Sequence, residues 1–177
     1  MSLDQLCPDR MPRDGFSLVE CLLVVALLGI LATLAIPSSS AVQRRLELDS
    51  GLRRLRVGLD RGRMAAQRER QPCALHLSAT GWQPPLAGEL PACRGGVTPL
   101  AETGAGALEL RSNLPDAIRF SSNGLVLDGG LVVLSHPSRG PALCLVIGLP
   151  LGISRNGVYR GDPSGSLSSA LCQPSDA

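Results

Sequence analysis

Residues 15–37 read GFSLVECLLVVALLGILATLAIP, and this stretch determines how the rest of the chain is interpreted. Between residues 16 and 36 the only polar side chains are Ser17, Glu20 and Thr33. About 20 consecutive apolar residues in a helix are long enough to cross the hydrocarbon core of a bilayer. We therefore expect a membrane-spanning helix over residues 16–36.

A cleaved secretory signal is the competing interpretation of this run. Such a signal has a shorter apolar region, which is followed by a cleavage site of small residues. The run here ends at Ile36-Pro37 without such a site, and no apolar segment precedes Cys7 as a lipoprotein signal would require. The sequence favours a helix that is retained.

Glu20 is the unusual residue of the run. A lone carboxylate costs about 2.5–3.5 kcal/mol at the middle of a bilayer, and less near the interface, so such groups usually have a partner. An interfacial glutamate without a role is the simpler alternative. The residues around Glu20 favour a role.

Gly15, Phe16 and Glu20 resemble the processing site of type IV pilins and type II secretion pseudopilins. In that family a prepilin peptidase cuts after the glycine, the new N-terminal phenylalanine is methylated, and a glutamate stands fifth after the cut. Pro37 matches a proline that breaks the helix in many members. The resemblance implies a leader over residues 1–15, or from Met11 if translation starts there.

The resemblance also implies a mechanism and a location. The ammonium group of Phe16 would be neutralised by Glu20 of a neighbouring subunit, as helices pack into a filament. The chain would be a single-pass inner-membrane protein with a periplasmic C-terminal domain, displayed at the cell surface when assembled. The arginines that follow the run, from Arg44 to Arg56, oppose this orientation under the positive-inside rule. We give the processing motif more weight than this charge count.

A second, amphipathic helix is predicted over residues 37–72. Its apolar stripe has helical spacing and consists of Leu48, Leu52, Leu55, Leu59 and Ala66. Gly51, Gly58 and Gly62 weaken the pattern, and Pro72 is expected to end it. Residues 44–70 contain nine arginines and four acidic residues, a net charge of +5. A solvated face is the simplest explanation of these arginines, and contact with the phosphates of DNA or lipid is the alternative.

Residues 73–177 have the pattern of short strands between turns. Residues 79–106 are expected to form an irregular connection that holds the single Trp82. Asn123-Gly124 and Asn156-Gly157 are hairpin signals, and Asp128-Gly129-Gly130 is a further turn. The predicted strands are Ala74–Leu77, Ala107–Arg111, Ala117–Ser121, Leu125–Leu127, Leu131–Ser135, Ala142–Ile147, Gly152–Ser154 and Val158–Arg160. The predicted fold class is α+β, a long N-terminal helix followed by an antiparallel β-sheet domain.

The end of the chain is similar to the C-terminal domain of GspH/FimT-type minor pilins and pseudopilins. Members of that group end in a hairpin with a Gly-Arg-x-Arg sequence, in a region implicated in DNA binding in DNA-uptake members. Gly157 and Arg160 match this pattern, whereas Val158 stands where the first arginine is expected. The resemblance makes Arg155 and Arg160 the candidate DNA-binding residues.

Six cysteines divide by location. Cys7 lies in the leader or before the true start of translation, and Cys21 is expected to pack as a small apolar residue in the membrane helix. The other four lie on the exported side, where disulfides persist. Of their three possible pairings we favour Cys73–Cys93 and Cys144–Cys172, because each closes a loop-rich segment.

An enzymatic or metal-binding role has little support. The chain has two histidines, His76 and His136, and no motif typical of a zinc site, a serine hydrolase or a phosphate-binding loop. We therefore expect no catalysis, no cofactor and no metal. Three functions stay open: a minor pilin that holds DNA for uptake, a GspH-type pseudopilin of type II secretion without DNA binding, and an anchored β-domain with no filament role. The expected partners are prepilin peptidase, other pilin subunits through the N-terminal helix, the inner membrane and DNA.

Overall fold

The structure is a computed structural model that describes residues 17–86, 90–100, 108–137 and 140–174. The side chains of residues 32–40 are outside this description as well. The chain divides into two units, Met1–Ser40 and Ala41–Ala177, which are described separately.

Helix α1 (Leu18–Glu69) is the longest element. The helix continues without a break through position 37. The interruption that the pilin resemblance implies at Pro37 is therefore not observed. In the first unit every described side chain of α1 is exposed, including Leu18 at 75% and Val19 at 70%. Within the described residues, no helix is long and apolar enough to cross a membrane.

In the second unit α1 carries the predicted apolar stripe. All five of its members are buried, which confirms the helical spacing: Leu48, Leu52, Leu55, Leu59 and Ala66. The helix ends at Glu69, and Arg70 follows with a positive φ of 52°. A left-handed residue after the last turn is a common way for a helix to end.

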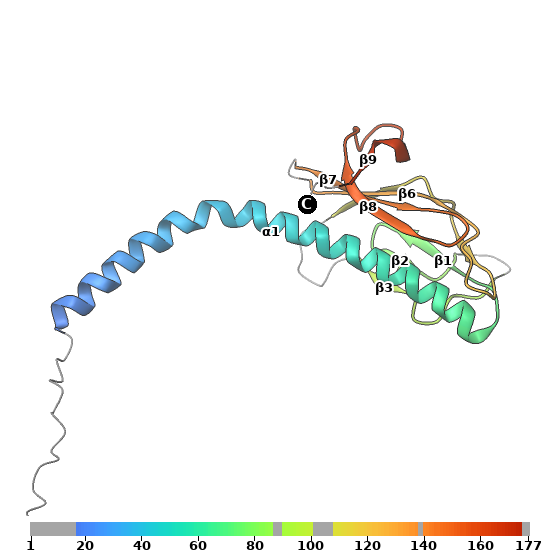
Figure 1. The fold of residues 1–177 in the computed structure, drawn as a ribbon, viewed down its shortest axis with the longest axis horizontal. Coiled ribbons are helices and arrows are strands. Elements are labelled where there is room, and N and C mark those ends of the chain that lie inside the picture. The colour runs from blue at the N-terminus through green and yellow to red at the C-terminus, as the bar shows by residue number, and fades with distance from the viewer. Residues whose placement is uncertain (1–16, 87–89, 101–107, 138–139, 175–177) are drawn as a thin grey trace, which may run out of the picture. The chain divides into compact units, whose positions relative to one another are not determined.

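Two antiparallel sheets follow α1 in the second unit (Figure 1). The first has the strand order β3-β2-β1-β5 and is built from β1 (Cys73–Ser78), β2 (Gly81–Gln83), β3 (Thr98–Pro99) and β5 (Ile118–Phe120). The second has the order β4-β6-β7-β8-β9 and is built from β4 (Glu109–Ser112), β6 (Gly130–Ser135), β7 (Ala142–Ile147), β8 (Ser154–Tyr159) and β9 (Cys172–Gln173). A short 3-10 helix, Ser169–Leu171, precedes β9.

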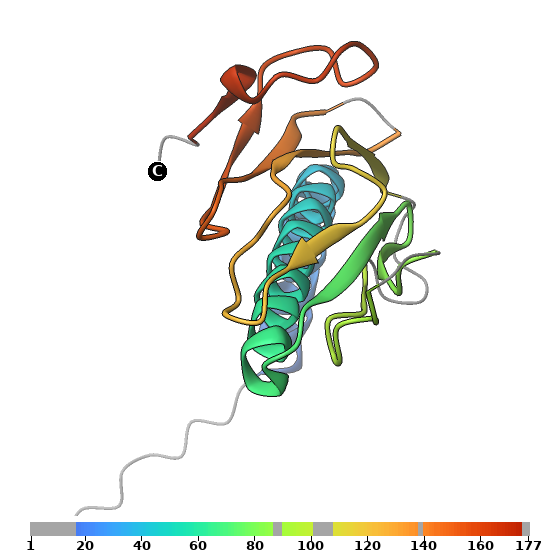
Figure 2. The same cartoon turned by 90° about the vertical axis from the view of Figure 1, so that its right-hand side faces the viewer.

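The main hydrophobic core lies between α1 and both sheets. Its members come from α1, β1, β2, β5, β6 and β7, among them Leu59, Leu75, Phe120 and Leu145. Figure 2 views this part of α1 nearly end-on, with strands of the two sheets beside and above it. A second, smaller cluster covers the other face of β6–β8 and includes Leu131, Val133 and Tyr159. The helix is therefore part of the globular fold of this unit.

Trp82 corrects one of the predictions. The segment 79–106 was expected to be irregular, but it contains β2 and β3, and Trp82 in β2 is fully buried. Its indole Nε1 donates a hydrogen bond of 2.7 Å to the carbonyl oxygen of Leu55 on α1. A buried indole usually finds such a partner, and here the bond connects the first sheet to the helix.

The second sheet corrects another prediction, the hairpin turn at Asn156-Gly157. Asn156 and Gly157 lie inside the continuous strand β8 and not in a turn, because they pair with Leu145 and Cys144 of β7. The predicted strand Leu125–Leu127 is reduced to one bridge between Phe120 and Val126. Strand pairing with β7 therefore overrides the local turn preference of the Asn-Gly pair.

Two disulfides stabilise the second unit, and they are the pairs that the sequence favoured. Cys73 pairs with Cys93, and Cys144 with Cys172, at Cα–Cα distances of 5.0 and 5.9 Å. The second bond attaches the C-terminal segment to β7. In the chain-entropy model, loops of this length give about 3 kcal/mol each.

Candidate functional site

The predicted assembly segment is described only in part. Gly15 and Phe16, the predicted processing residues, lie outside the described residues. Ser17 begins the helix: its carbonyl oxygen accepts from the backbone N–H of Cys21 at 3.1 Å, and its hydroxyl accepts from the N–H of Val19 at 3.3 Å.

Glu20 lies in the first turn of α1 and is exposed. Within the described part of the chain its side chain makes no hydrogen bond or ion pair. A carboxylate in the first turn is favourable to the helix dipole by about 0.3–1 kcal/mol. Its carboxylate is therefore at the surface of the helix.

The two candidate DNA-binding arginines do not share a face of β8. Arg155 pairs with Val146, which packs against the second cluster. Arg160 follows the end of β8 and lines a groove together with Asn156 and Val158, on the face that is turned toward α1. Because successive residues of a strand point to opposite faces, an odd separation of five places these side chains apart.

The groove beside Arg160 lies within the second unit and has a volume of about 290 Å³. Arg45 and Asp49 of α1 line its opposite side. Leu48 and Leu52 on α1 and Leu143 on β7 supply its apolar surface. The sequence did not indicate this convergence, because Arg45 and Arg160 are distant in the chain and only the packing of α1 on the second sheet brings them to one groove.

The histidines have structural contacts. The Nδ1 of His76 is hydrogen-bonded to the carbonyl oxygen of Asp116. The Nε2 of His136 lies 3.8 Å from a carboxylate oxygen of Glu47 on α1. No group of three or more His, Cys, Asp and Glu residues in the described ranges could hold a metal ion.

Comparison with known proteins gives one result for the N-terminal segment. Residues 10–36 match the prokaryotic N-terminal methylation motif. The match supports a type IV pilin-like protein. It includes Gly15, Phe16 and Glu20, the residues on which the resemblance depends, and it ends before the second unit. No curated protein and no solved structure matches the chain.

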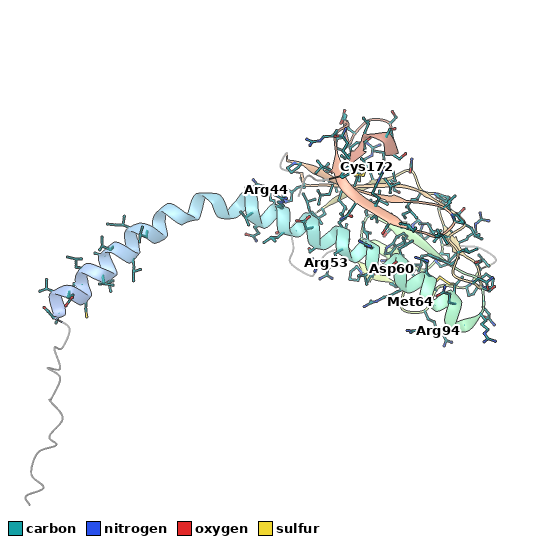
Figure 3. The ribbon with its side chains drawn as sticks, viewed as in Figure 1. Arg44, Arg53, Asp60, Met64, Arg94 and Cys172 are labelled. Carbon is teal, nitrogen blue, oxygen red and sulfur yellow. A yellow bond between two sulfur atoms is a disulfide. The ribbon has the colours of Figure 1, made fainter. Side chains whose placement is uncertain are left out.

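The arginines on the second half of α1 differ in the contacts that they make. Arg63 donates from Nε to the carbonyl oxygen of Gly124 at 3.3 Å, and Glu69 pairs with Arg94 at 3.4 Å. Figure 3 shows Arg94 beside the end of α1. Arg61 and Arg68 line a second pocket of about 380 Å³ together with Arg94. These arginines therefore lie at the surface of the second unit.

Two neighbouring loops carry exposed apolar side chains, in segments where the sequence analysis predicted the strands Leu125–Leu127 and Gly152–Ser154. They are tied together by a hydrogen bond of 2.8 Å from the N–H of Val126 to the carbonyl oxygen of Pro150. The exposed side chains on them are Leu125, Leu127, Leu149, Leu151 and Ile153. Clustered exposed apolar groups are typical of protein contact surfaces.

The loop after β5 is held by an ion pair that responds to pH. Arg119 contacts both carboxylate oxygens of Asp128 at 2.8 Å, and its backbone N–H donates to Oδ2 at 3.0 Å. The side-chain hydrogen bonds from Arg119 hold the pKa of Asp128 below its ordinary value, against the opposing effect of burial. A depressed carboxyl pKa stabilises the fold above the ordinary pKa of about 4 and loses that contribution at lower pH.

We therefore expect Asp128 to contribute to acid sensitivity. The melting temperature of the wild type should fall as the pH drops below about 4, through the depressed pKa of Asp128. In Asp128→Asn this part of the fall should be absent, while the melting temperature at neutral pH should be slightly lower. Thermal unfolding at a series of pH values measures both effects. An identical pH profile in wild type and variant would contradict the expectation.

Proposed function

We propose that this chain is a minor pilin or pseudopilin. It would be made as a precursor, cut after Gly15 by prepilin peptidase and methylated on Phe16. The apolar segment 16–36 would anchor it in the inner membrane and later join the core of a filament. The observation that carries the proposal is the prokaryotic N-terminal methylation motif at residues 10–36.

Glu20 would act in assembly. Cleavage leaves a positive ammonium group at Phe16, beside a run of exposed apolar side chains. A charge of this kind is costly in a medium of low dielectric constant unless an opposite charge neutralises it. Glu20 of the adjacent subunit supplies that charge and sets the register of the two helices.

The proposed work is assembly and surface display, and it needs no catalysis. The second unit, with its own core and two disulfides, would be the part that contacts other proteins. The exposed apolar loops at Leu125 and Ile153 are candidates for these contacts.

Mass spectrometry of the membrane-extracted protein tests the proposal. We expect the mature chain to begin at Phe16 and to be heavier by one methyl group, and we expect Gly15→Leu to leave the precursor intact. Cys21→Ala is the matched control, because it changes the same segment outside the processing site and should be processed normally. An intact N-terminus in the wild type would favour the anchored β-domain with no filament role.

Two versions of the proposal differ in their partners. A subunit of a DNA-uptake pilus would hold DNA, whereas a type II secretion pseudopilin of GspH type would bind only other pseudopilins. Arg155 and Arg160 lie on different faces of β8, so a DNA segment on one face would use only one of them. If DNA is bound there, one of the single variants Arg155→Gln and Arg160→Gln should weaken binding and the other should not.

A further inference from the structure

We propose that the groove lined by Arg45, Asp49, Asn156 and Arg160 binds the headgroup of an anionic phospholipid. The inference depends on the membrane anchor that is part of the proposed function. It assigns a ligand to a site that neither the methylation motif nor the assembly mechanism explains.

The first support is an excess of positive charge, because the groove has two arginines and only one carboxylate, Asp49. Arg45 and Arg160 come from α1 and from the end of β8, and neither has an ion pair or side-chain hydrogen bond among the described residues. Two guanidinium groups in one small groove repel each other, and an added anion would reduce the repulsion that the one carboxylate of Asp49 leaves. Guanidinium groups bind phosphate oxygens through paired hydrogen bonds, which makes arginine well suited to this ligand.

The second support is the match between the groups that line the groove and those of a phospholipid. Its two arginines and Asp49 give a net charge of +1, which complements the single negative charge of a phosphodiester. Asp49 and Asn156 can accept hydrogen bonds from hydroxyl groups of a glycerol headgroup. The apolar surface of Leu48, Leu52 and Leu143 can contact the first carbons of the lipid chains.

The third support is the position of the groove in the chain. Arg45 follows the end of the apolar run at Ile36 by nine residues. Helix α1 is continuous over these nine residues, which extend about 13 Å along the chain. Basic clusters directly beyond a membrane segment are typical of binding to anionic lipids.

DNA is the alternative anion, and the groove suits it less. Binding to DNA depends on arrays of positive charge along the backbone of the duplex. The groove here is small, and its lining holds only two arginines beside the carboxylate of Asp49, which would repel a phosphate backbone. A lipid headgroup, with one phosphate and adjacent hydroxyls, matches the same set of groups better.

The test uses the full chain, purified in a neutral detergent and observed by native mass spectrometry. Short-chain phosphatidylglycerol, short-chain phosphatidylcholine, glycerol 3-phosphate and a short DNA duplex are titrated separately. We expect phosphatidylglycerol to bind about tenfold more tightly than phosphatidylcholine, with Arg45→Gln/Arg160→Gln reducing its affinity about tenfold or more. Glycerol 3-phosphate should bind more weakly than phosphatidylglycerol, because it lacks the acyl chains.

The matched control is Arg61→Gln/Arg68→Gln, which removes the same charge from α1 outside the groove. It should change the affinity for phosphatidylglycerol less than about twofold. Equal losses in both double variants would overturn the proposal, as would equal binding of the two lipids. Stronger effects of Arg45 and Arg160 on DNA than on lipid would overturn it in favour of a nucleic-acid site.

The result of the lipid-binding test does not depend on whether the chain is cut after Gly15. A precursor that is never cut at Gly15 can still bind phosphatidylglycerol in detergent, which would refute the pilin function and leave the lipid site. A chain that is cut and methylated but does not distinguish the lipids would refute the lipid site alone.

Discussion

Gly58→Ala should destabilise the second unit by about 2–3 kcal/mol, although alanine is the better helix former. A Cβ atom at this position would lie 2.1 Å from Cδ1 of Trp82 and 2.4 Å from Oγ1 of Thr98. Trp82 has little freedom to move, because it is fully buried and its indole is bonded to Leu55 one turn earlier on α1. The gain of about 1 kcal/mol in helix propensity is smaller than the cost of displacing β2 from the helix.

The single tryptophan of the chain reports directly on this contact. Denaturant unfolding followed by its fluorescence should show a lower midpoint for Gly58→Ala, with emission shifted toward that of an exposed indole. Gly51→Ala and Gly62→Ala should be milder, since their nearest atoms are side-chain carbons at 2.9 Å. Gly29→Ala is the control in the same helix, because nothing lies within 4 Å of its Cβ position. A Gly58→Ala protein as stable as the control would contradict the packing described for β2.

The glycines of α1 show where pattern-based prediction stopped. The apolar stripe from Leu48 to Ala66 was predictable, because helical periodicity depends only on which face is buried. Gly51, Gly58 and Gly62 were taken to weaken the helix, but they let the side chains of both sheets approach it closely. Close approach depends on what packs on the helix, and a local pattern does not contain that information.

The same limit of local sequence patterns explains which strands were predicted correctly and which were not. β7 was predicted at its observed bounds, Ala142–Ile147, from a continuous apolar run. β8 was divided at Asn156-Gly157, because the turn preference of this pair is local while its pairing with β7 is not. β2 and β3 were missed because their strands are three and two residues long and their ladder joins segments far apart in the chain.

The candidate sites likewise differ in whether the sequence alone could reveal them. The motif at Gly15, Phe16 and Glu20 is a contiguous signal and was visible in the sequence. The groove at Arg45 and Arg160 depends on the packing of α1 against β8, so only the structure reveals it. The separation of Arg155 from Arg160 likewise follows from strand alternation once β8 is known to be continuous.

Glu20→Ala should leave the chain in the membrane and cleaved after Gly15, but its incorporation into filaments should fall by tenfold or more. In the proposed assembly this change leaves the ammonium group of Phe16 on a neighbouring subunit without a counter-ion. Removing one partner of a buried ion pair costs about 3–5 kcal/mol, which corresponds to more than a hundredfold in an equilibrium constant. Partial hydration near the helix end reduces that effect, so tenfold is the lower bound.

The size of the loss distinguishes this mechanism from a simple helix effect. A carboxylate in the first turn of α1 stabilises the helix by about 0.3–1 kcal/mol through the dipole, which would change incorporation less than about fivefold. The measurement is the ratio of subunit in sheared filaments to subunit in the membrane, with mass spectrometry to establish that the N-terminus is processed. Glu20→Gln keeps the size of the side chain and should lose as much as Glu20→Ala, whereas Glu20→Asp should retain part of the function. Cys21→Ala, beside it on the exposed helix, should assemble normally. Wild-type incorporation of Glu20→Gln would show that the charge is not used in assembly, and the counter-ion mechanism would then be wrong even if Phe16 is methylated.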